Sequence, residues 1–187
     1  SNNSLSYSNL APIAAIKLIA ESGGGFVYSK KGSNTLSIKP LYKKTFWDAL
    51  TVDDYDRLIP ESLVTSQSTD YELYPDYNGI TLTNDRTGKQ GQVKRTGTAA
   101  DVLLPPENNP LFDVVSMGAF GKAKLAKAGM VETHTLTMPI STEVGECAPG
   151  EVFAFNAQWW GIVESVSVSF SHAKVNQTVK VERVNRE

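Results

Sequence analysis

The chain has 187 residues, 41% of them hydrophobic, which is enough apolar material for one sizeable core or two small ones. Its 18 basic and 20 acidic residues give a net charge of −2, so the overall charge does not favour nucleic acid or an anionic membrane as a partner. The single cysteine, Cys147, excludes an internal disulfide framework and a multi-cysteine metal site.

No apolar stretch approaches the roughly 18 residues that a membrane-spanning helix needs, and no secretory signal is visible at the N-terminus. The first regular element is expected only about eight residues after the opening Ser1-Asn2-Asn3. From this abrupt start we expect the chain to be a fragment of a longer protein.

Residues 9–40 are expected to form a helix followed by a hairpin. Asn9 is a suitable N-cap, and Pro12 falls in the first turn, where its missing N–H does no harm. The helix is apolar almost all round, which predicts that it is mostly buried, and the glycines 23–25 end it. The alternating stretches 26–29 and 35–39 then predict two paired strands joined by a turn at residues 31–34.

Residues 48–77 are rich in acidic and hydroxyl side chains and contain Pro60 and Pro75. We interpret this stretch as a connector without long regular elements. Residues 58–60 and 62–64 are its candidate short strands.

A second unit begins with a strand over residues 77–83, which can pair with residues 92–96. Asn109-Pro110 predicts the start of a helix that runs to about residue 128. Gly118 and Gly121 weaken this helix by about 1 kcal/mol each relative to alanine, so we expect another backbone to pack closely against that face. A strand over residues 132–138 follows.

The end of the chain predicts three consecutive strands between residues 149 and 184. Apolar and polar residues alternate there, as in Val166-Ser167-Val168-Ser169-Phe170, which is typical of a half-buried strand. The predicted fold is therefore α+β and mostly β. It has an N-terminal helix-plus-hairpin unit (1–47), a connector (48–76) and a C-terminal antiparallel, β-barrel-like unit with one packed helix (77–187).

Two glycine motifs do not fit phosphate binding. The run Gly118–Ala123 has only two residues between its glycines, lacks Ser or Thr after Lys122 and lies inside the predicted helix. The glycines at 23–25 follow a helix, so they cannot present a helix N-terminus to a phosphate group.

Titratable residues suggest no reaction centre. Asp53, Asp54, Asp56 and Glu61 lack the spacing of a calcium loop, and we interpret them as a solvated acidic stretch; a hydrolase using Asp53 or Asp54 is the weaker alternative. His134 and His172 are far apart in the chain, which argues against a histidine-based metal site or triad.

Aromatic residues offer a different kind of site. Trp159 and Trp160 are adjacent on a predicted strand, so they point to opposite faces. We expect one to fill the core and the other to lie at a subunit contact, where tryptophan is enriched. The candidate interface residues are Trp159, Trp160, Phe155, Gly118 and Gly121.

Several short stretches in chain order resemble phage or prophage tail proteins of the tail-tip or baseplate hub type. They are a helix ending in glycines, Phe26-Val27-Tyr28, Tyr77-Asn78-Gly79-Ile80, Lys94–Ala99, Pro149-Gly150-Glu151-Val152, Trp160–Ser167 and Gln177–Arg183. The resemblance covers most of the chain outside residues 48–77. It implies β-barrel domains arranged in a ring below the tail tube, and it supplies no catalytic residues to transfer.

The resemblance implies a structural, non-enzymatic role without a cofactor. The expected partners are copies of the chain, in a trimer, and other tail proteins such as tube, spike or fibre, with no nucleic acid and no membrane span. The expected location is the virion tail, or the bacterial cytoplasm during expression from a prophage. The alternative left open is a carbohydrate-binding module that uses Trp159 or Trp160 with Tyr71, Tyr74 and Tyr77.

Overall fold

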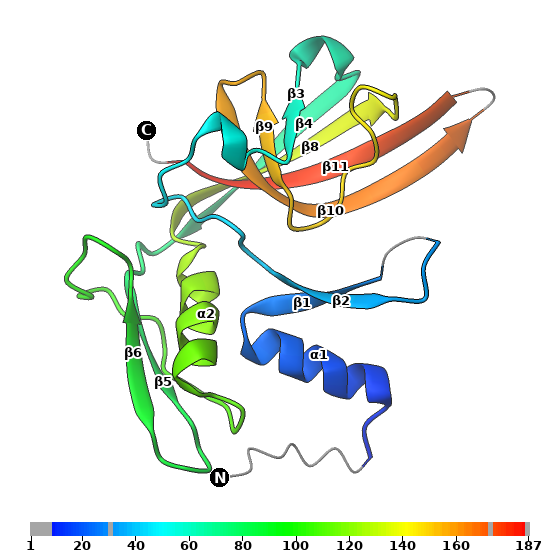
Figure 1. Ribbon diagram of the computed structural model, residues 1–187. Coiled ribbons are helices and arrows are strands. Elements are labelled where there is room, and N and C mark those ends of the chain that lie inside the picture. Colours follow the sequence, from blue (N-terminus) through cyan, green and yellow to red (C-terminus); the bar gives the residue numbers. More distant parts are fainter. Residues whose placement is uncertain (1–8, 30–31, 172–173, 186–187) are drawn as a thin grey trace. The chain divides into compact units, whose positions relative to one another are not determined.

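The computed structural model describes residues 9–29, 32–171 and 174–185, and within these ranges it contains two α-helices and eleven strands in three sheets. The prediction of a mostly β fold is confirmed (Figure 1). The chain divides into two compact units, and each is built from two separate stretches. Unit 1 comprises residues 1–42 and 75–127; unit 2 comprises residues 43–74 and 128–187.

This grouping differs from the predicted ranges 1–47, 48–76 and 77–187. The stretch expected to be a connector supplies strands β3 (Arg57–Ile59) and β4 (Ser66–Tyr74) to the main sheet of unit 2. Residues 61–63, which overlap the candidate strand 62–64, form the 3₁₀ helix η2 directly after Pro60, and η1 occupies Val52–Asp54. β4 was missed because Ser, Gln and Asp have low strand propensity, whereas pairing with a neighbouring strand determines its conformation.

In unit 1, α1 (Pro12–Ser22) precedes the hairpin of β1 (Gly25–Ser29) and β2 (Leu36–Pro40), as predicted. The cap differs, because Ala11 is the N-cap and Asn9 has a φ of 80° outside the helix. The helix is also less buried than predicted. Only Ala15, Ala20 and Ser22 are buried, while Ile13 is 52% exposed.

The other half of unit 1 is a three-stranded sheet of order β6-β5-β7 with α2 packed on β5 and β6. The elements are β5 (Gly79–Thr83), β6 (Gln90–Lys94), β7 (Glu107–Asn108) and α2 (Val114–Leu125). α2 starts later than predicted, because Asp113 and Ser116 form a reciprocal capping box there. The predicted helix thus belongs to unit 1, whereas the strands between residues 129 and 185 with which it was grouped belong to unit 2.

The two glycines of α2 have different surroundings. A Cβ at Gly121 would lie 2.6–2.8 Å from three side-chain atoms of Val93 in β6, whereas a Cβ at Gly118 would meet nothing within 4 Å. The close neighbour of Gly121 is therefore a side chain, and the expected backbone contact is not found at either glycine.

We predict opposite effects of alanine at these two positions. Gly118→Ala should stabilise unit 1 by up to about 1 kcal/mol through helix propensity alone. Gly121→Ala gains the same propensity but forces Val93 away, and overpacking of about 1–3 kcal/mol should make it destabilising. Urea titrations followed by circular dichroism at 222 nm would measure both. A Gly121→Ala protein as stable as Gly118→Ala would contradict the packing described here.

Unit 2 contains a six-stranded sheet of order β3-β9-β10-β11-β8-β4, in which only the β3–β9 pair is parallel. The strands not yet introduced are β8 (Gly129–Pro139), β9 (Val152–Phe155), β10 (Trp159–Ser171) and β11 (Lys174–Asn185). The three predicted C-terminal strands are β9, β10 and β11. Within the described residues no ladder joins β3 to β4, so the sheet is open rather than a closed barrel.

The core of unit 2 lies on one face of this sheet, here called the core face. Phe153, Leu136 and Val179 are fully buried on it, and the loop 140–151 covers it with Val144 and Cys147. Gly161 allows close approach of the strands, because a Cβ there would lie 2.4 Å from the Glu182 carbonyl oxygen. Burial is not confined to this face, because Val131, Val152, Ala154 and Ile162 on the opposite face are buried as well.

Candidate functional site

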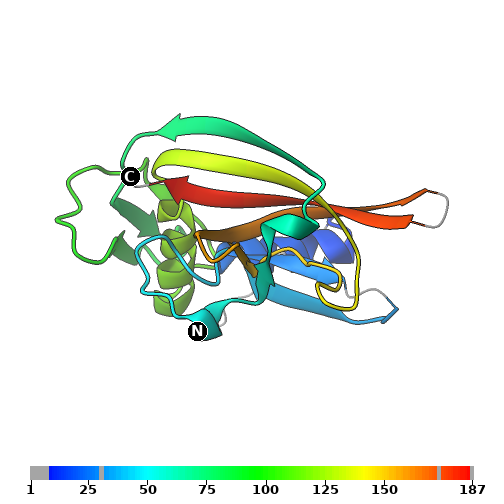
Figure 2. The ribbon, with the colours of Figure 1, turned by 90° about the horizontal axis from the view of Figure 1, so that it is seen from above.

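Two strand edges of the six-stranded sheet in unit 2 have no strand partner among the described residues. β4 pairs with β8 on one side, and in the described residues no strand pairs with its other side. Seven of its nine residues are exposed, namely 66–68 and 70–73. Figure 2 shows β4 at the margin of the sheet, followed by β8, β11 and β10. An unpaired strand edge offers a row of backbone N–H and C=O groups to another strand.

A second open edge is the distal part of β10, defined here as residues 165–171. β9 pairs with β10 only at residues 159–162, whereas β11 pairs with it as far as Ser171. The side of the distal part of β10 that faces away from β11 therefore has no strand partner among the described residues. Figure 1 shows β10 and β11 extending together well past β9.

Both open edges carry exposed apolar side chains on the core face. The registers place Thr69, Tyr71 and Leu73 of β4 on the same face as Leu136 and Val179, together with Val166, Val168 and Phe170 of β10. Tyr71, Leu73 and Phe170 are 67%, 76% and 78% exposed. The apolar surface of the core face thus continues uncovered to each edge, which is unusual for side chains of this size.

A polar cluster lies on the core face beside β4, here called the His134 cluster. His134 Nε2 lies 2.9 Å from Glu132 Oε2, and its Nδ1 lies 3.0 Å from the Thr69 hydroxyl of β4. The Trp159 ring stacks on the His134 ring with centroids 4.2 Å apart, and Asn185 Nδ2 donates to Glu132 over 2.7 Å. Burial opposes ionisation of Glu132, but hydrogen bonds from Asn185 and His134 outweigh it, so its pKa lies below the usual value.

These contacts give the His134 cluster a structural role. Thr69 is the only member on β4, and its bond to His134 links the open edge strand to the buried strand β8. Arg183 adds a positive charge 3.5 Å from Glu132. The polar side chains of the His134 cluster thus form hydrogen bonds and ion pairs with one another.

The loop between β8 and β9 is held down by two side chains. Arg57 donates to both carboxylate oxygens of Glu151 and to the carbonyls of Val144 and Glu146. Gln177, fully buried on β11, accepts from the Cys147 N–H and donates to the Gly145 carbonyl. Burial raises the pKa of the Cys147 thiol to about 11, so it stays protonated near neutral pH.

Two carboxylates of the acidic stretch, the candidate for a hydrolase site, stabilise the local fold. Asp54 caps η1 at Thr51 and pairs with Lys44 over 2.8 Å, and the Lys44 hydrogen bond in particular holds its pKa at about 2. Asp56 pairs with Lys43 and accepts from the Val152 N–H. These carboxylates therefore anchor the start of unit 2, where β3 joins the sheet.

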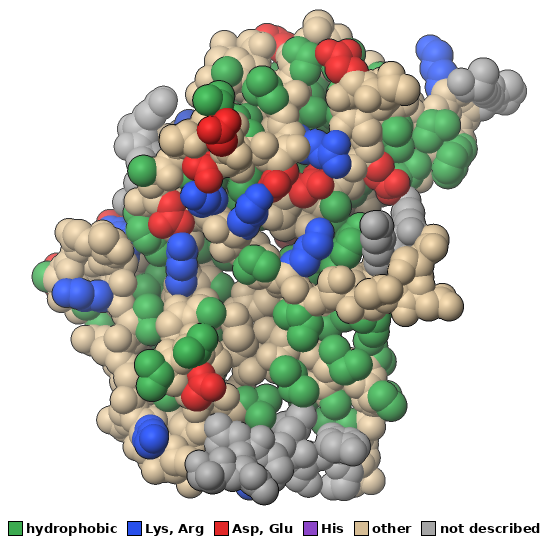
Figure 3. All heavy atoms as spheres, viewed as in Figure 1, with side chains coloured by type: hydrophobic (Ala, Val, Ile, Leu, Met, Phe, Trp, Pro, Cys, Tyr) green, Lys and Arg blue, Asp and Glu red, His purple; other side chains and the backbone are tan. Residues whose placement is uncertain are grey.

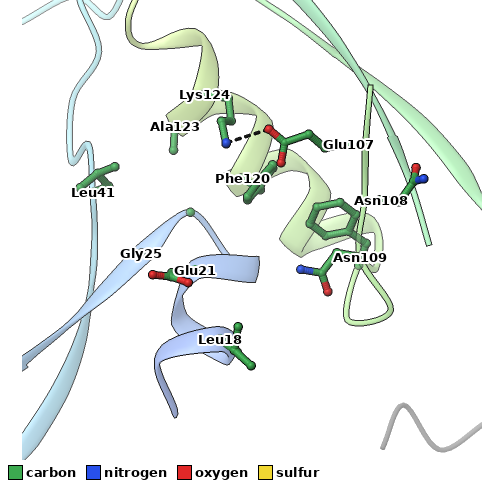
Figure 4. A pocket seen from close by; sticks show the side chains of 12 residues that line it. Leu18, Glu21, Gly25, Leu41, Glu107, Asn108, Asn109, Phe120, Ala123 and Lys124 are labelled. Atoms are coloured by element: carbon green, nitrogen blue, oxygen red, sulfur yellow. Dashed lines mark ion pairs between the residues drawn. The ribbon is translucent and has the colours of Figure 1, made fainter. Parts of the chain in front are cut away.

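Unit 1 contains a hollow of about 370 Å³ between α1, β7 and α2 (Figure 4). Phe112 and Phe120 form part of its wall, and Glu107 at its rim forms an ion pair of 2.7 Å with Lys124. Glu21 also lines it, and its carboxylate lies 3.6 Å from the Lys17 amine. Both carboxylates that line the hollow are therefore paired with lysines.

The candidate interface residues are distributed over both units. Phe155 is buried in the core of unit 2, and Trp159 packs half-buried against it with ring centroids 5.2 Å apart. Trp160 is half-buried on the opposite face of β10, as strand geometry predicts. Gly118 and Gly121 lie in unit 1. Their role at an interface stays a prediction.

Other predicted groupings are not brought together. Tyr71 and Tyr74 occupy opposite faces of β4, and Tyr77 belongs to unit 1. His172 lies outside the described residues, so the histidine pair has no structural account. Leu73 and Phe170 are exposed but were not among the predicted interface residues. The period-two spacing of Tyr71 and Leu73 is the sequence signal that places these two side chains on one face of a strand.

Across residues 9–29, 32–171 and 174–185, no group of three or more His, Cys, Asp or Glu side chains could hold a metal ion. In this part of the chain no helix has the length and apolarity to cross a bilayer. Figure 3 shows acidic and basic side chains lying among one another, most of them in the upper part of the view.

Three solved structures resemble this chain in fold. The tail protein from Neisseria meningitidis MC58 matches with a TM-score of 0.53 and 10% identity, over 93% of this chain and 55% of that one. The prophage MuSo2 43 kDa tail protein from Shewanella oneidensis matches with a TM-score of 0.54 and 12% identity, over 92% and 54%. The prophage tail protein gp18 from Listeria monocytogenes EGD-e matches with a TM-score of 0.52 and 13% identity, over 95% and 54%.

At these identities the likeness establishes a shared fold, in agreement with the resemblance noted from the sequence. The chain spans a little over half the length of each of these three proteins. No protein-family model matches the sequence, and no curated protein matches it significantly.

Proposed function

We propose that this chain, which has the fold of phage and prophage tail proteins, is a structural component of a phage-type tail. The observation that supports this most strongly is the fold match to three such proteins over more than nine-tenths of the chain. The role is non-enzymatic and hub-like, at the tail tip or baseplate. Its location is the virion tail, or the bacterial cytoplasm while a prophage is expressed.

The proposed mechanism is assembly through protein–protein contacts. The two open edges of the six-stranded sheet are suited to it, because a neighbouring chain can satisfy their backbone groups and cover the apolar residues beside them. Copies of the chain are the first partner, in a closed ring whose expected form is a trimer. Tube, spike or fibre proteins are the other partners.

The proposed tail role can be tested on phage particles purified from bacteria that carry the gene. We expect mass spectrometry to find the chain in the tail fraction and immunogold labelling to place it at one end of the tail. Deleting the gene should abolish complete tails while heads still form, because assembly stops at the missing component. Complete wild-type tails that the antibody does not label would contradict the proposal, as would normal tails after deletion of the gene.

A further inference from the structure

We infer that copies of this chain join through one defined contact, in which the distal part of β10 of one copy pairs antiparallel with the edge strand β4 of the next. This inference rests on the proposed function and names the surfaces that carry the assembly. Two edges of one sheet that differ in sequence and face opposite ways make a head-to-tail contact, which closes into a ring when the rotation allows it.

The two edges lie on opposite sides of the same sheet. The order is β3-β9-β10-β11-β8-β4, so β4 opens on the side of β8, whereas the distal part of β10 opens on the side of β9. A copy placed beside β10 without being turned over therefore presents its β4 to that edge. β3 is a poorer edge, because it has three residues and is followed by Pro60.

Strand direction agrees with this pairing. β10 is antiparallel to β11, β11 to β8, and β8 to β4. β4 consequently runs opposite to β10 in every copy, and a neighbour in the same orientation places its β4 antiparallel to β10. Antiparallel ladders have the stronger hydrogen-bond geometry, and a stretch of seven residues is as long as an ordinary strand.

This pairing also places apolar side chains of both copies on the same face of the joined sheet. In the joined sheet, Val166, Val168 and Phe170 of one copy share the core face with Tyr71 and Leu73 of the next. The exposed Tyr71, Leu73 and Phe170 and the half-buried Val166 and Val168 would cover one another, as cross-strand aromatic and β-branched pairs do. A contact in which the neighbour is turned over would instead place Asp70 and Glu72 beside Phe170.

Charge complementarity on the opposite face distinguishes β4 from a second β10 as the partner. Residues 165–171 carry no charged side chain there, only the serines 165, 167, 169 and 171, and Lys174 and Lys180 flank them on β11. β4 presents Asp70 and Glu72 on that face. Two β10 edges would provide no carboxylate opposite these lysines, because residues 165–171 carry none, and would leave Tyr71 and Leu73 uncovered.

Cysteine cross-linking tests the pairing directly. β10 and β4 are separated by three strand spacings, about 14 Å, so a disulfide between them cannot form within one copy. We would combine Ser169→Cys with Ser68→Cys, Asp70→Cys or Glu72→Cys, which all lie on the same face, and oxidise the purified protein. The native Cys147 is buried and does not interfere.

The expected result is a ladder of disulfide-linked chains for at least one of these three pairs, lost on reduction. The matched control combines Ser169→Cys with Thr69→Cys or Tyr71→Cys, which lie on the core face, and should stay uncross-linked. As an independent measurement, Phe170→Lys should shift the mass from light scattering towards the monomer with an unchanged circular dichroism spectrum.

The outcomes separate this inference from the proposed function. Cross-linking of Ser169→Cys alone, or equally strong cross-linking of the control pairs, overturns the β4–β10 contact. An oligomer whose three test pairs all fail to cross-link overturns it too and leaves assembly as a tail component standing. A protein that is monomeric at all concentrations overturns the contact together with the ring.

Discussion

Replacing Phe153 with alanine is expected to lower the free energy of unfolding of unit 2 by about 3–5 kcal/mol, the usual cost of removing a fully buried phenylalanine. Phe153 is completely buried in β9, with Gly161 of β10 on one side of it and Arg57 of β3 on the other. Its ring fills the centre of the core face, where the neighbouring strands are fixed by hydrogen bonds and cannot move in to fill the space.

Tryptophan fluorescence measures this effect selectively. All three tryptophans, Trp47, Trp159 and Trp160, belong to unit 2, so a urea titration followed by their emission reports on that unit. Val52→Ala is the control, because it removes an apolar side chain from a position of unit 2 that is 73% exposed and lies outside both open edges, and it should change stability by less than about 0.5 kcal/mol. Similar losses for both variants would show that Phe153 is not packed as described.

Replacing Gln177 with methionine is expected to cost about 2–4 kcal/mol, although the size of the side chain hardly changes. Gln177 is fully buried, and the substitution leaves the Cys147 N–H and the Gly145 carbonyl without their partner. Each buried polar group that loses its hydrogen bond costs about 1–3 kcal/mol. The loop 140–151 should then detach from the core face before the sheet unfolds.

Thiol accessibility measures that detachment. In the native protein the buried Cys147 should react slowly with a thiol reagent, whereas in Gln177→Met it should react much faster at the same pH, since the loop that covers it opens. Asn176→Met, at the adjacent half-buried position on the other face of β11, is the control and should leave the rate unchanged. Unchanged rates in both variants would mean that Gln177 does not hold the loop.

The parts of the fold that could be predicted are those whose sequence pattern agrees with their surroundings. The hairpin after α1 and the strands β9, β10 and β11 follow from alternation and turn residues, and the structure confirms them. α1 was correctly predicted as a helix, but its burial was not, because an apolar sequence indicates only that a surface needs a partner.

The candidate site was harder to predict, because an open edge is a property of the sheet and not of a strand. Nothing in residues 66–74 shows that β8 is the one strand paired with β4 in the described part of the chain, and the parallel β3–β9 contact joins residues almost one hundred positions apart. Trp159 and Trp160 are candidate interface residues because they are large and aromatic, yet the side chains of Tyr71, Leu73 and Phe170 are more exposed.

The chain passes between its two units at residues 42–43, 74–75 and 127–128, so neither unit is a continuous segment. During synthesis, unit 1 cannot be completed until residue 127 has left the ribosome, and unit 2 cannot be completed until β11 has followed. Sheets that depend on such distant segments close late. In newly made chains the edge of β8 that later pairs with β11 is therefore exposed until β11 has been synthesised. High expression should then favour association between incompletely folded chains.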